Sequence, residues 1–167
     1  MNLEEWCKRE LDDVYVSTII MKEQAYKRVN GVPKKQELYI FMGLNLRGYK
    51  KVIDVIVPNE NTTSYWFNKI SEFKARGIKE LFMVAMLENE NMNRAIKYYI
   101  KKLENDIPYM FQLYEYPIEI RKLIYTTNPI ESLNSELRKV TNGKRYFVNE
   151  KTLEKVLCLR VEKYIKI

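Results

Sequence analysis

The sequence predicts a domain of the α/β or α+β class, because β-type and helical patterns follow one another along 167 residues. Three segments rich in Val, Ile and Tyr come first and are separated by turn signals. A helical stripe, a further apolar strand and a helical last third come after them. A chain of this length suits one domain, spanning residues 1–167, with a substantial core.

The first three segments predict strands at about 15–29, 37–45 and 49–57 that pair as a meander. The first turn is expected at Asn30-Gly31-Val32-Pro33, and the second runs from Asn45 to Gly48. The third strand carries a nearly continuous apolar run, which is typical of a well-buried strand.

A helix and a fourth strand are predicted next. The helix opens after 58–61 and carries an apolar stripe, and Gly77 stands where a helix C-terminal glycine is expected. The stripe consists of Trp66, Phe67, Ile70 and Phe73. The run at 78–87 reads as a strand, reached by a crossover if it joins the sheet in parallel. The strands therefore occupy about 15–57 and 78–87.

The part from about 91 to 167 is predicted to be helical. One helix is expected at about 91–104, an irregular segment at 105–117 and a last helix at about 150–166. Another helix begins near Asn128, which suits an N-cap and is followed by proline. Its expected buried stripe is Ile130, Leu133, Leu137 and Val140.

Composition narrows the chemistry. A net charge of +7 favours a polyanionic partner such as nucleic acid. The chain has no His, which excludes a histidine base or metal ligand, and its two Cys are too few for a zinc site. Any metal would be a hard ion bound by oxygen, hence Mg²⁺ or Mn²⁺. The sequence shows no apolar leader and no apolar run of about 18 residues, so a cytoplasmic location without a membrane span is expected.

The segment from Arg121 to Thr141 is the most informative one. It places Glu131 on the first turn of a helix whose exposed side is polar and basic. A carboxylate beside cations suits a metal-assisted enzyme of nucleic acid. A glutamate at this position also satisfies backbone donors and favours the helix dipole without any chemistry. Both interpretations of Glu131, metal ligand and cap, stay open.

Basic and amide side chains around Glu131 are candidate DNA contacts, because phosphate oxygens are bound by such groups. Alternatively, these side chains form only the solvent-exposed charged face of the helix. The candidates are Arg121, Asn128, Asn134, Arg138, Lys139, Lys144 and Arg145.

This segment resembles the C-terminal signature of Mutator-type insertion-sequence transposases, which reads roughly IRK-x-IYTTN-x-IES-x-N-x-x-LRK. Further similarities lie upstream with gap-free spacing. They are Trp6-x-x-Arg9, Gly43-x-Asn45-x-x-Gly48, Tyr65-Trp66 and Arg76-Gly77.

The resemblance implies an RNase H-like core and cut-and-join DNA transposition at phosphodiesters. Family members use two aspartates and one glutamate to hold two Mg²⁺ or Mn²⁺ ions. Three carboxylates are needed because two close cations must be neutralised and held rigidly.

In the gap-free register, the two aspartate positions are Met21 and Leu87, and Glu131 is the only remaining acid. A rival register makes Asp12 the first acid but leaves Leu87 apolar. Glu23 and Glu88 lie near the lost positions, although metal sites tolerate only small ligand displacements. The family's internal helical segment and N-terminal DNA-binding region also find no counterpart.

The sequence therefore predicts a Mutator-type transposase by descent whose catalysis is lost. An alternative is a non-catalytic DNA-binding remnant that regulates or inhibits an intact transposase. Residual activity with stand-in carboxylates and a relic without function are further readings. The expected partners are DNA, another copy of the chain or an intact transposase, in the nucleoid of the cytoplasm.

Overall fold

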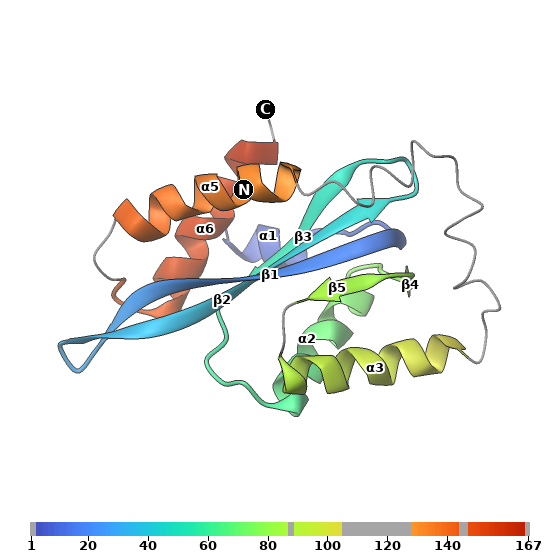
Figure 1. Cartoon of the computed structure of the whole chain (residues 1–167), viewed down its shortest axis with the longest axis horizontal. Helices are drawn as coiled ribbons and strands as arrows, with labels where there is room; N and C mark the ends of the chain where they lie inside the picture. Colours follow the sequence, from blue (N-terminus) through green and yellow to red (C-terminus); the bar gives the residue numbers. More distant parts are fainter. Residues whose placement is uncertain (1–2, 87–88, 105–127, 144–146, 166–167) are drawn as a thin grey trace.

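A mixed β-sheet in the order β3-β2-β1-β4 is the centre of the structure, a computed structural model that describes residues 3–86, 89–104, 128–143 and 147–165. β5 also pairs with β1. Helices cover both faces of the sheet (Figure 1). The strands are β1 (Val14–Val29), β2 (Val32–Asn45), β3 (Lys50–Ile56), β4 (Glu80–Leu81) and β5 (Val84–Met86). The helices are α1 (Leu3–Lys8), α2 (Thr63–Ala75), α3 (Glu90–Glu104), α5 (Asn128–Gly143) and α6 (Glu150–Ile165).

The β1–β2 hairpin turns more tightly than the sequence predicted. Asn30 and Gly31 have φ values of 51° and 80°, which suit the two central residues of a type I′ turn, and Val29 pairs with Val32. β2 therefore starts at Val32, so the expected start at residue 37 is wrong. Pro33 is tolerated because it lies on a strand edge that no other strand pairs with.

The Gly43-x-Asn45-x-x-Gly48 motif holds the second turn. The Asn45 side-chain oxygen accepts hydrogen bonds from the backbone N–H groups of Arg47 (3.1 Å) and Tyr49 (2.9 Å), and Gly48 has a φ of 81°. Gly43 lies under the Tyr15 ring, where an added Cβ would be 2.2 Å from a ring carbon. The glycine-asparagine-glycine spacing is thus a structural requirement of this sheet edge.

The predicted helix and crossover are confirmed by α2 and the two short strands that follow it. The Thr62 side chain caps α2 by accepting from the Tyr65 N–H, and Gly77 follows the helix with a φ of 117°. β4 and β5 both run parallel to β1. The fourth strand, expected to be continuous, is divided between them.

The helical third is confirmed where it is described. α3, α5 and α6 agree with the predicted helices, whereas 105–117 lies outside the described residues. Leu133 and Leu137 of the predicted α5 stripe are fully buried. The short helix α1 has no counterpart among the predicted elements.

The sheet separates two apolar clusters. Trp66, Phe73 and Met92 of α2 and α3 pack with Tyr39 and Ile53 of the sheet. On the other face, α1, α5 and α6 pack against β1, β2 and β3. That second cluster includes Trp6, Met21, Leu38, Ile40, Val55, Leu133, Leu137, Leu157 and Val161. Strand alternation sends neighbouring residues of β1 to opposite clusters, Ile20 to the first and Met21 to the second.

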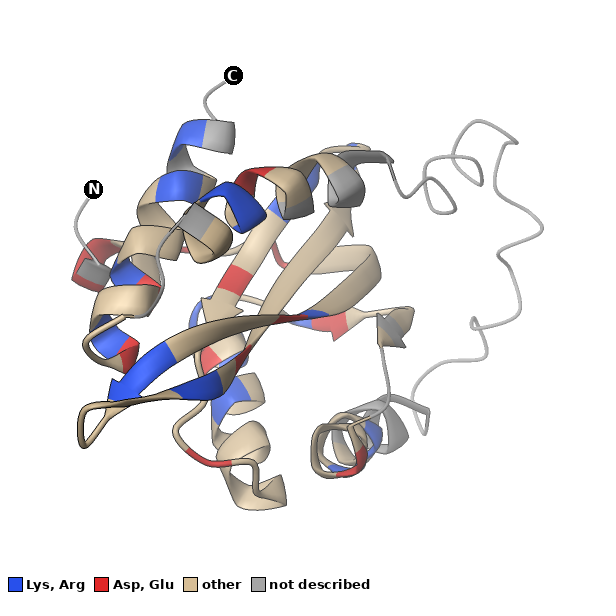
Figure 2. Cartoon of the chain, turned by 60° about the vertical axis from the view of Figure 1, so that its left-hand side comes forward, with Lys and Arg blue, Asp and Glu red and all other residues tan. Residues whose placement is uncertain are grey.

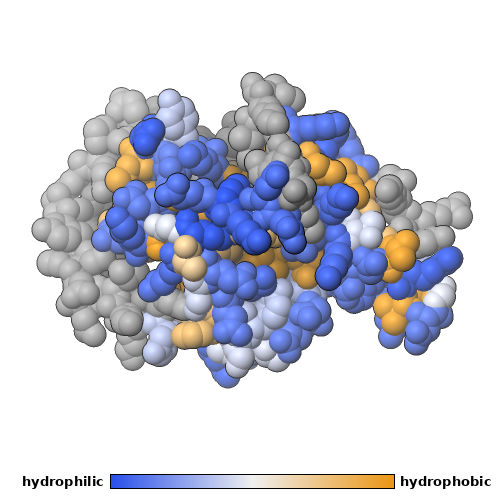
Figure 3. Space-filling model, turned by 180° about the vertical axis from the view of Figure 1, so that it is seen from behind, coloured by the Kyte–Doolittle hydropathy of each residue, from blue (hydrophilic) through white to orange (hydrophobic). Residues whose placement is uncertain are grey.

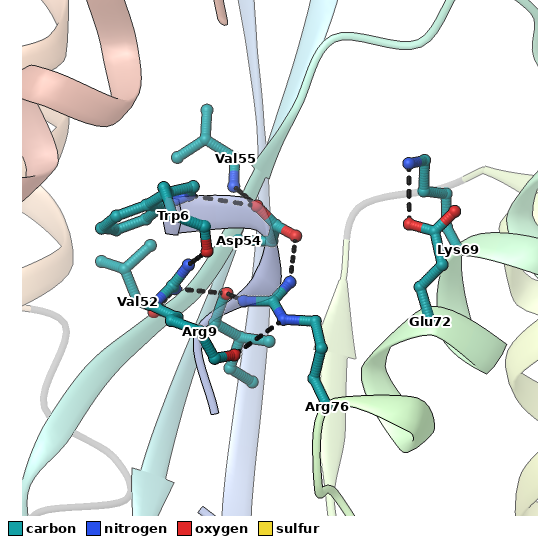
Figure 4. Close-up of polar contacts among 9 residues, drawn as sticks. Trp6, Arg9, Val52, Asp54, Val55, Lys69, Glu72 and Arg76 are labelled. Carbon is teal, nitrogen blue, oxygen red and sulfur yellow. Dashed lines mark hydrogen bonds and ion pairs between the residues drawn. The ribbon is translucent and has the colours of Figure 1, made fainter. Parts of the chain in front are cut away.

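A buried ion pair between Asp54 and Arg76 lies at the β3 edge of the sheet (Figure 4). The Arg76 guanidinium donates to the Asp54 carboxylate at 2.6 Å, and both side chains are about nine-tenths buried. Trp6 Nε1 also donates to Asp54, at 3.4 Å. Arg9 stacks on the Trp6 ring, with its guanidinium carbon 3.5 Å from the ring centroid.

The same two arginines satisfy backbone carbonyls of the edge strand. The β2–β3 register shifts at Ile53, and the Ile53 carbonyl accepts hydrogen bonds from Arg9 (2.5 Å) and Arg76 (3.2 Å). Arg9 also donates to the Val52 carbonyl at 2.6 Å. Burial, reinforced by Arg76, lowers the pKa of Arg9 to about 10, and Asp54 acts in the opposite direction.

Asp54→Ala should lower the free energy of unfolding by about 3–5 kcal/mol, because it leaves a buried guanidinium without its counter-charge. Urea unfolding followed by tryptophan fluorescence measures this loss. Asp13→Ala is the control, because the Asp13–Lys79 pair is exposed and 3.8 Å long. Equal effects of the two substitutions would contradict the role given to Asp54.

Candidate active site

The two positions predicted for the family's aspartates, Met21 and Leu87, each come directly after a residue of a paired strand. Ile20 of β1 and Met86 of β5 are partners in the parallel ladder, and Met21 and Leu87 are the next residues of their segments. Leu87 lies outside the described residues. The pairing of Ile20 with Met86 brings β1 and β5 together immediately before the two predicted positions.

Met21 lies on the sheet face that α5 covers. Its side chain is 7% exposed and belongs to the same apolar cluster as Leu133 and Leu137 of α5. Its cross-strand partner is Ile40, which is fully buried. The described surroundings of Met21 are therefore apolar, and they suit its thioether side chain rather than a carboxylate.

Glu131 lies in the first turn of α5, two residues before Leu133. α5 and β1 are in contact, so the backbone of Glu131 and that of Met21 belong to packed neighbouring elements. The side chains of Glu131, Asn128 and Asn134 lie outside what the structure describes, and so do residues 121, 144 and 145. The roles predicted for these six residues stay predictions.

The acid of the rival register, Asp12, lies beside the β2–β3 turn. Its carboxylate accepts hydrogen bonds from Lys51 (3.1 Å) and the Asn45 side chain (3.2 Å). Partial burial opposes ionisation, but these two bonds hold the pKa of Asp12 below its ordinary value. Asp12 thus has a structural partner set at the turn.

Glu23, the nearest acid along β1, is paired with a predicted DNA contact. Both Nε and one terminal nitrogen of Arg138 donate to the same Glu23 oxygen, at 3.3 and 2.9 Å. The Glu23 side chain is 17% exposed and that of Arg138 is 60% exposed. This ion pair joins β1 to α5 across the sheet face that holds Met21.

Lys139, the other predicted cation whose side chain is described, pairs with Glu136 one turn earlier in α5. Glu136 also accepts a hydrogen bond from Arg160 of α6. The Lys139 contact lowers the pKa of Glu136, and Arg160 adds to the effect. The exposed side of α5 is therefore an ion-pair network with Arg138 and Lys139 at its surface.

Among the described residues, no three acidic, cysteine or histidine side chains gather as a metal site would require. Within the same residues, no helix is long and apolar enough to cross a bilayer. Two divalent ions held by oxygen need several converging carboxylates. The described side chains near Met21 do not fit that requirement.

The sequence signature at 121–141 and the motif residues Trp6, Arg9 and Arg76 indicate one family. The family model for transposases of the Mutator family matches residues 1–103 and 89–164. The chain belongs to the Mutator family of transposases.

Curated relatives agree with this membership. The transposase for insertion sequence element IS905 of Lactococcus lactis subsp. lactis is 32% identical over 144 residues, which is 85% of this chain and 34% of that protein. The transposase for insertion sequence element IS1201 of Lactobacillus helveticus is 23% identical over 232 positions, covering 97% of this chain and 61% of the relative. A probable transposase of Corynebacterium diphtheriae is 31% identical over 91 residues, 54% of this chain and 25% of that protein. The chain thus spans between a quarter and three fifths of the relatives' lengths.

Sequence reasoning noted several family motifs but missed that they form one site. Trp6 and Arg76 donate to Asp54, which no motif had indicated, and Arg9 stacks on Trp6 and donates to the neighbouring Val52 carbonyl. An isolated acid in the apolar run of β3 was the available signal, because a buried charge requires a partner. These residues hold the sheet edge and are remote in the sequence from the signature segment.

Met21→Asp should lower the free energy of unfolding by about 3–5 kcal/mol near pH 7, the usual cost of an uncompensated buried charge. Burial raises the pKa of such an aspartate above its unfolded value of about 3.9. The penalty is therefore complete above the folded pKa and should shrink as the pH falls below it.

Urea unfolding at several pH values checks this expectation, with Met21→Leu as the control. That substitution keeps the apolar volume and should cost less than about 1.5 kcal/mol. Stabilisation of Met21→Asp by added Mn²⁺, absent from Met21→Leu, would contradict the apolar surroundings by showing other acids within reach.

Proposed function

We propose that this Mutator-family chain binds DNA through the basic side of α5 but does not cut it. The proposal includes an RNase H-like core. The antiparallel β1–β2–β3 meander, the crossover through α2 and the parallel pairing of β4 and β5 with β1 support that core. Helices on both faces of the sheet agree with it.

The environment of Met21 is the observation that carries the loss of catalysis. The family resemblance puts a metal-binding aspartate there, yet the side chain packs with Leu133 and Leu137 of the helix that bears Glu131. Removing one ligand from a two-metal site takes away charge that would stabilise both attacking and leaving oxygens. Each 1.36 kcal/mol of lost transition-state stabilisation costs about tenfold in rate.

A missing internal segment also belongs to this proposal. The alignment with the Lactobacillus helveticus relative spans 232 positions, although this chain has 167 residues, so the relative has positions that this chain lacks. The family model likewise matches in two parts. We therefore propose that this chain has the sheet and the C-terminal helices of the family but lacks an internal segment between them.

Exposed cations beside the former metal site favour DNA as the partner. Arg138 is 60% exposed and Lys139 is 61% exposed, so both can reach a phosphate despite their intramolecular partners. A phosphate offers these cations the same kind of charge-assisted hydrogen bond that their carboxylate partners accept. The net charge of +7 acts in the same direction.

A DNA-binding chain without catalysis would compete with an active transposase for the same DNA. The family membership favours this regulatory role over a general DNA-binding one, because the family model matches residues 89–164, which include the signature segment. Co-expression with an active relative should then lower its transposition frequency.

The protein should not nick supercoiled plasmid in Mg²⁺ or Mn²⁺, because the described side chains around Met21 do not form a site for paired ions. It should still shift labelled duplex DNA, with an affinity that falls steeply with salt and is unchanged by EDTA. A nicking gel and an anisotropy titration test the two parts. Metal-dependent nicking that disappears in Glu131→Ala would contradict the proposed loss of catalysis. Absence of DNA binding at low salt would contradict the proposed DNA binding.

Glu23→Gln should tighten DNA binding, because it releases Arg138 from its intramolecular partner. One additional phosphate contact should steepen the dependence of log K on log salt by about 1. Glu60→Gln is the control, because it makes the same change in net charge at an exposed site between β3 and α2. Equal gains in both variants would mean that overall charge, and not the release of Arg138, is responsible.

A further inference from the structure

The β1–β2 hairpin extends well past the rest of the sheet. β5 pairs with β1 only from Thr18 to Ile20, and β2 pairs with β3 only from Tyr39 onward. The part from residue 24 to residue 37, which we term the arm, is therefore a two-stranded ribbon for most of its length. Figure 1 shows the tip of the arm projecting beyond α5 and α6, and the space-filling view shows a protrusion with both hydrophilic and hydrophobic surface (Figure 3).

The arm is held by hydrogen bonds along both of its strands. Phe147, which precedes α6, donates its N–H to the Tyr26 carbonyl at 2.7 Å and accepts from the Arg28 N–H at 2.8 Å. Gln36 donates to the Pro58 carbonyl at 2.8 Å on the other strand. The arm is thus a positioned element with an ordered type I′ turn at its end.

Cations concentrate on both strands of the arm. Residues 24–37 contain four Lys or Arg and one acid (Figure 2). Lys27 and Lys34 are direct cross-strand partners, an arrangement of like charges that destabilises a ribbon by itself. Lys27 is paired with Glu150, whereas Lys34 and Lys35 are exposed and have no ion pair with any described residue.

An aromatic side chain accompanies these cations. Tyr26 is 43% exposed and lies directly opposite Lys35 in the ladder. Amphipathic rings next to cations are suited to sugar and base surfaces beside phosphates. A two-stranded ribbon also has the dimensions that the major groove of B-DNA admits.

We propose that the arm is a second DNA-contacting element, which binds the backbone of duplex DNA through Lys34 and Lys35. This inference rests on the proposed DNA-binding function. The Glu23–Arg138 pair lies next to the arm, and strand alternation places Lys34 on the same face of the ribbon as Glu23, and Lys35 with Tyr26 on the opposite face. The arm therefore continues the basic surface of α5 through Lys34. A duplex along α5 would meet the arm beyond the edge of the sheet.

Lysines on an open strand edge can also serve to prevent edge-to-edge aggregation. That role and DNA binding make different predictions. An edge-protecting pair matters for the monodispersity of the protein and leaves its affinity for DNA unchanged. Size-exclusion chromatography of each variant therefore accompanies the binding measurement.

The test is the affinity of Lys34→Ala/Lys35→Ala for a labelled 30-base-pair duplex, measured by anisotropy across about 50–200 mM salt. Loss of two phosphate contacts should weaken binding about tenfold or more at low salt and reduce the salt slope by about 2. Lys34→Arg/Lys35→Arg should retain the wild-type affinity, because arginine preserves the charge. The matched control is Lys79→Ala/Lys97→Ala, which removes two exposed cations remote from the arm and should lower the slope far less.

The outcomes separate this inference from the proposed function. Wild-type binding that is unchanged in Lys34→Ala/Lys35→Ala, or weakened equally in the control, overturns the role of the arm alone. Absence of DNA binding by the wild-type protein overturns the arm and the proposed function together. Tighter binding to duplex RNA of the same sequence would overturn the assignment to DNA.

Discussion

The buried Asp54–Arg76 pair is the constraint on which the rest of the structure depends. β3 is an edge strand with a register shift, so its backbone carbonyls would otherwise be buried without partners. Arg9 and Arg76 satisfy them, and Asp54 compensates the charge that this requires. Because Arg9 comes from the segment after α1 and Arg76 ends α2, one network fixes elements on both sides of the sheet.

Periodicity and turn chemistry predicted most of the elements, since long amphipathic patterns are governed by local geometry. The misplaced start of β2 has a local cause: Val32 and Pro33 read as turn residues because a proline rarely enters a strand. The Asn30-Gly31 turn and the open edge of β2 make that position acceptable. No local pattern predicted the division of the fourth strand, because the division depends on how residues 78–87 pair with β1.

The sequence predicted where the candidate site lies in the chain but gave no account of the environment of Met21. Gap-free spacing of the family motifs assigned the first aspartate position to Met21. Helical spacing predicted that Leu133 and Leu137 would be buried, as they are. Nothing local indicates that these leucines would pack with Met21. The Glu23–Arg138 pair joins residues 115 positions apart, and only the packing of α5 on β1 brings them together. Contacts of this kind depend on tertiary structure, which a single sequence does not encode in any short pattern.

The proposed loss of catalysis with retention of DNA binding follows from where each charge lies. Carboxylates that face one another under a helix are costly unless cations neutralise them, so an apolar residue at such a site stabilises the scaffold once metal binding is lost. Met21 fits this description, because it adds to the cluster that holds α5 on the sheet. Exposed cations such as Arg138 and Lys34 carry no comparable cost in water. The proposed loss of the acids with retention of the basic surface therefore has a thermodynamic reason.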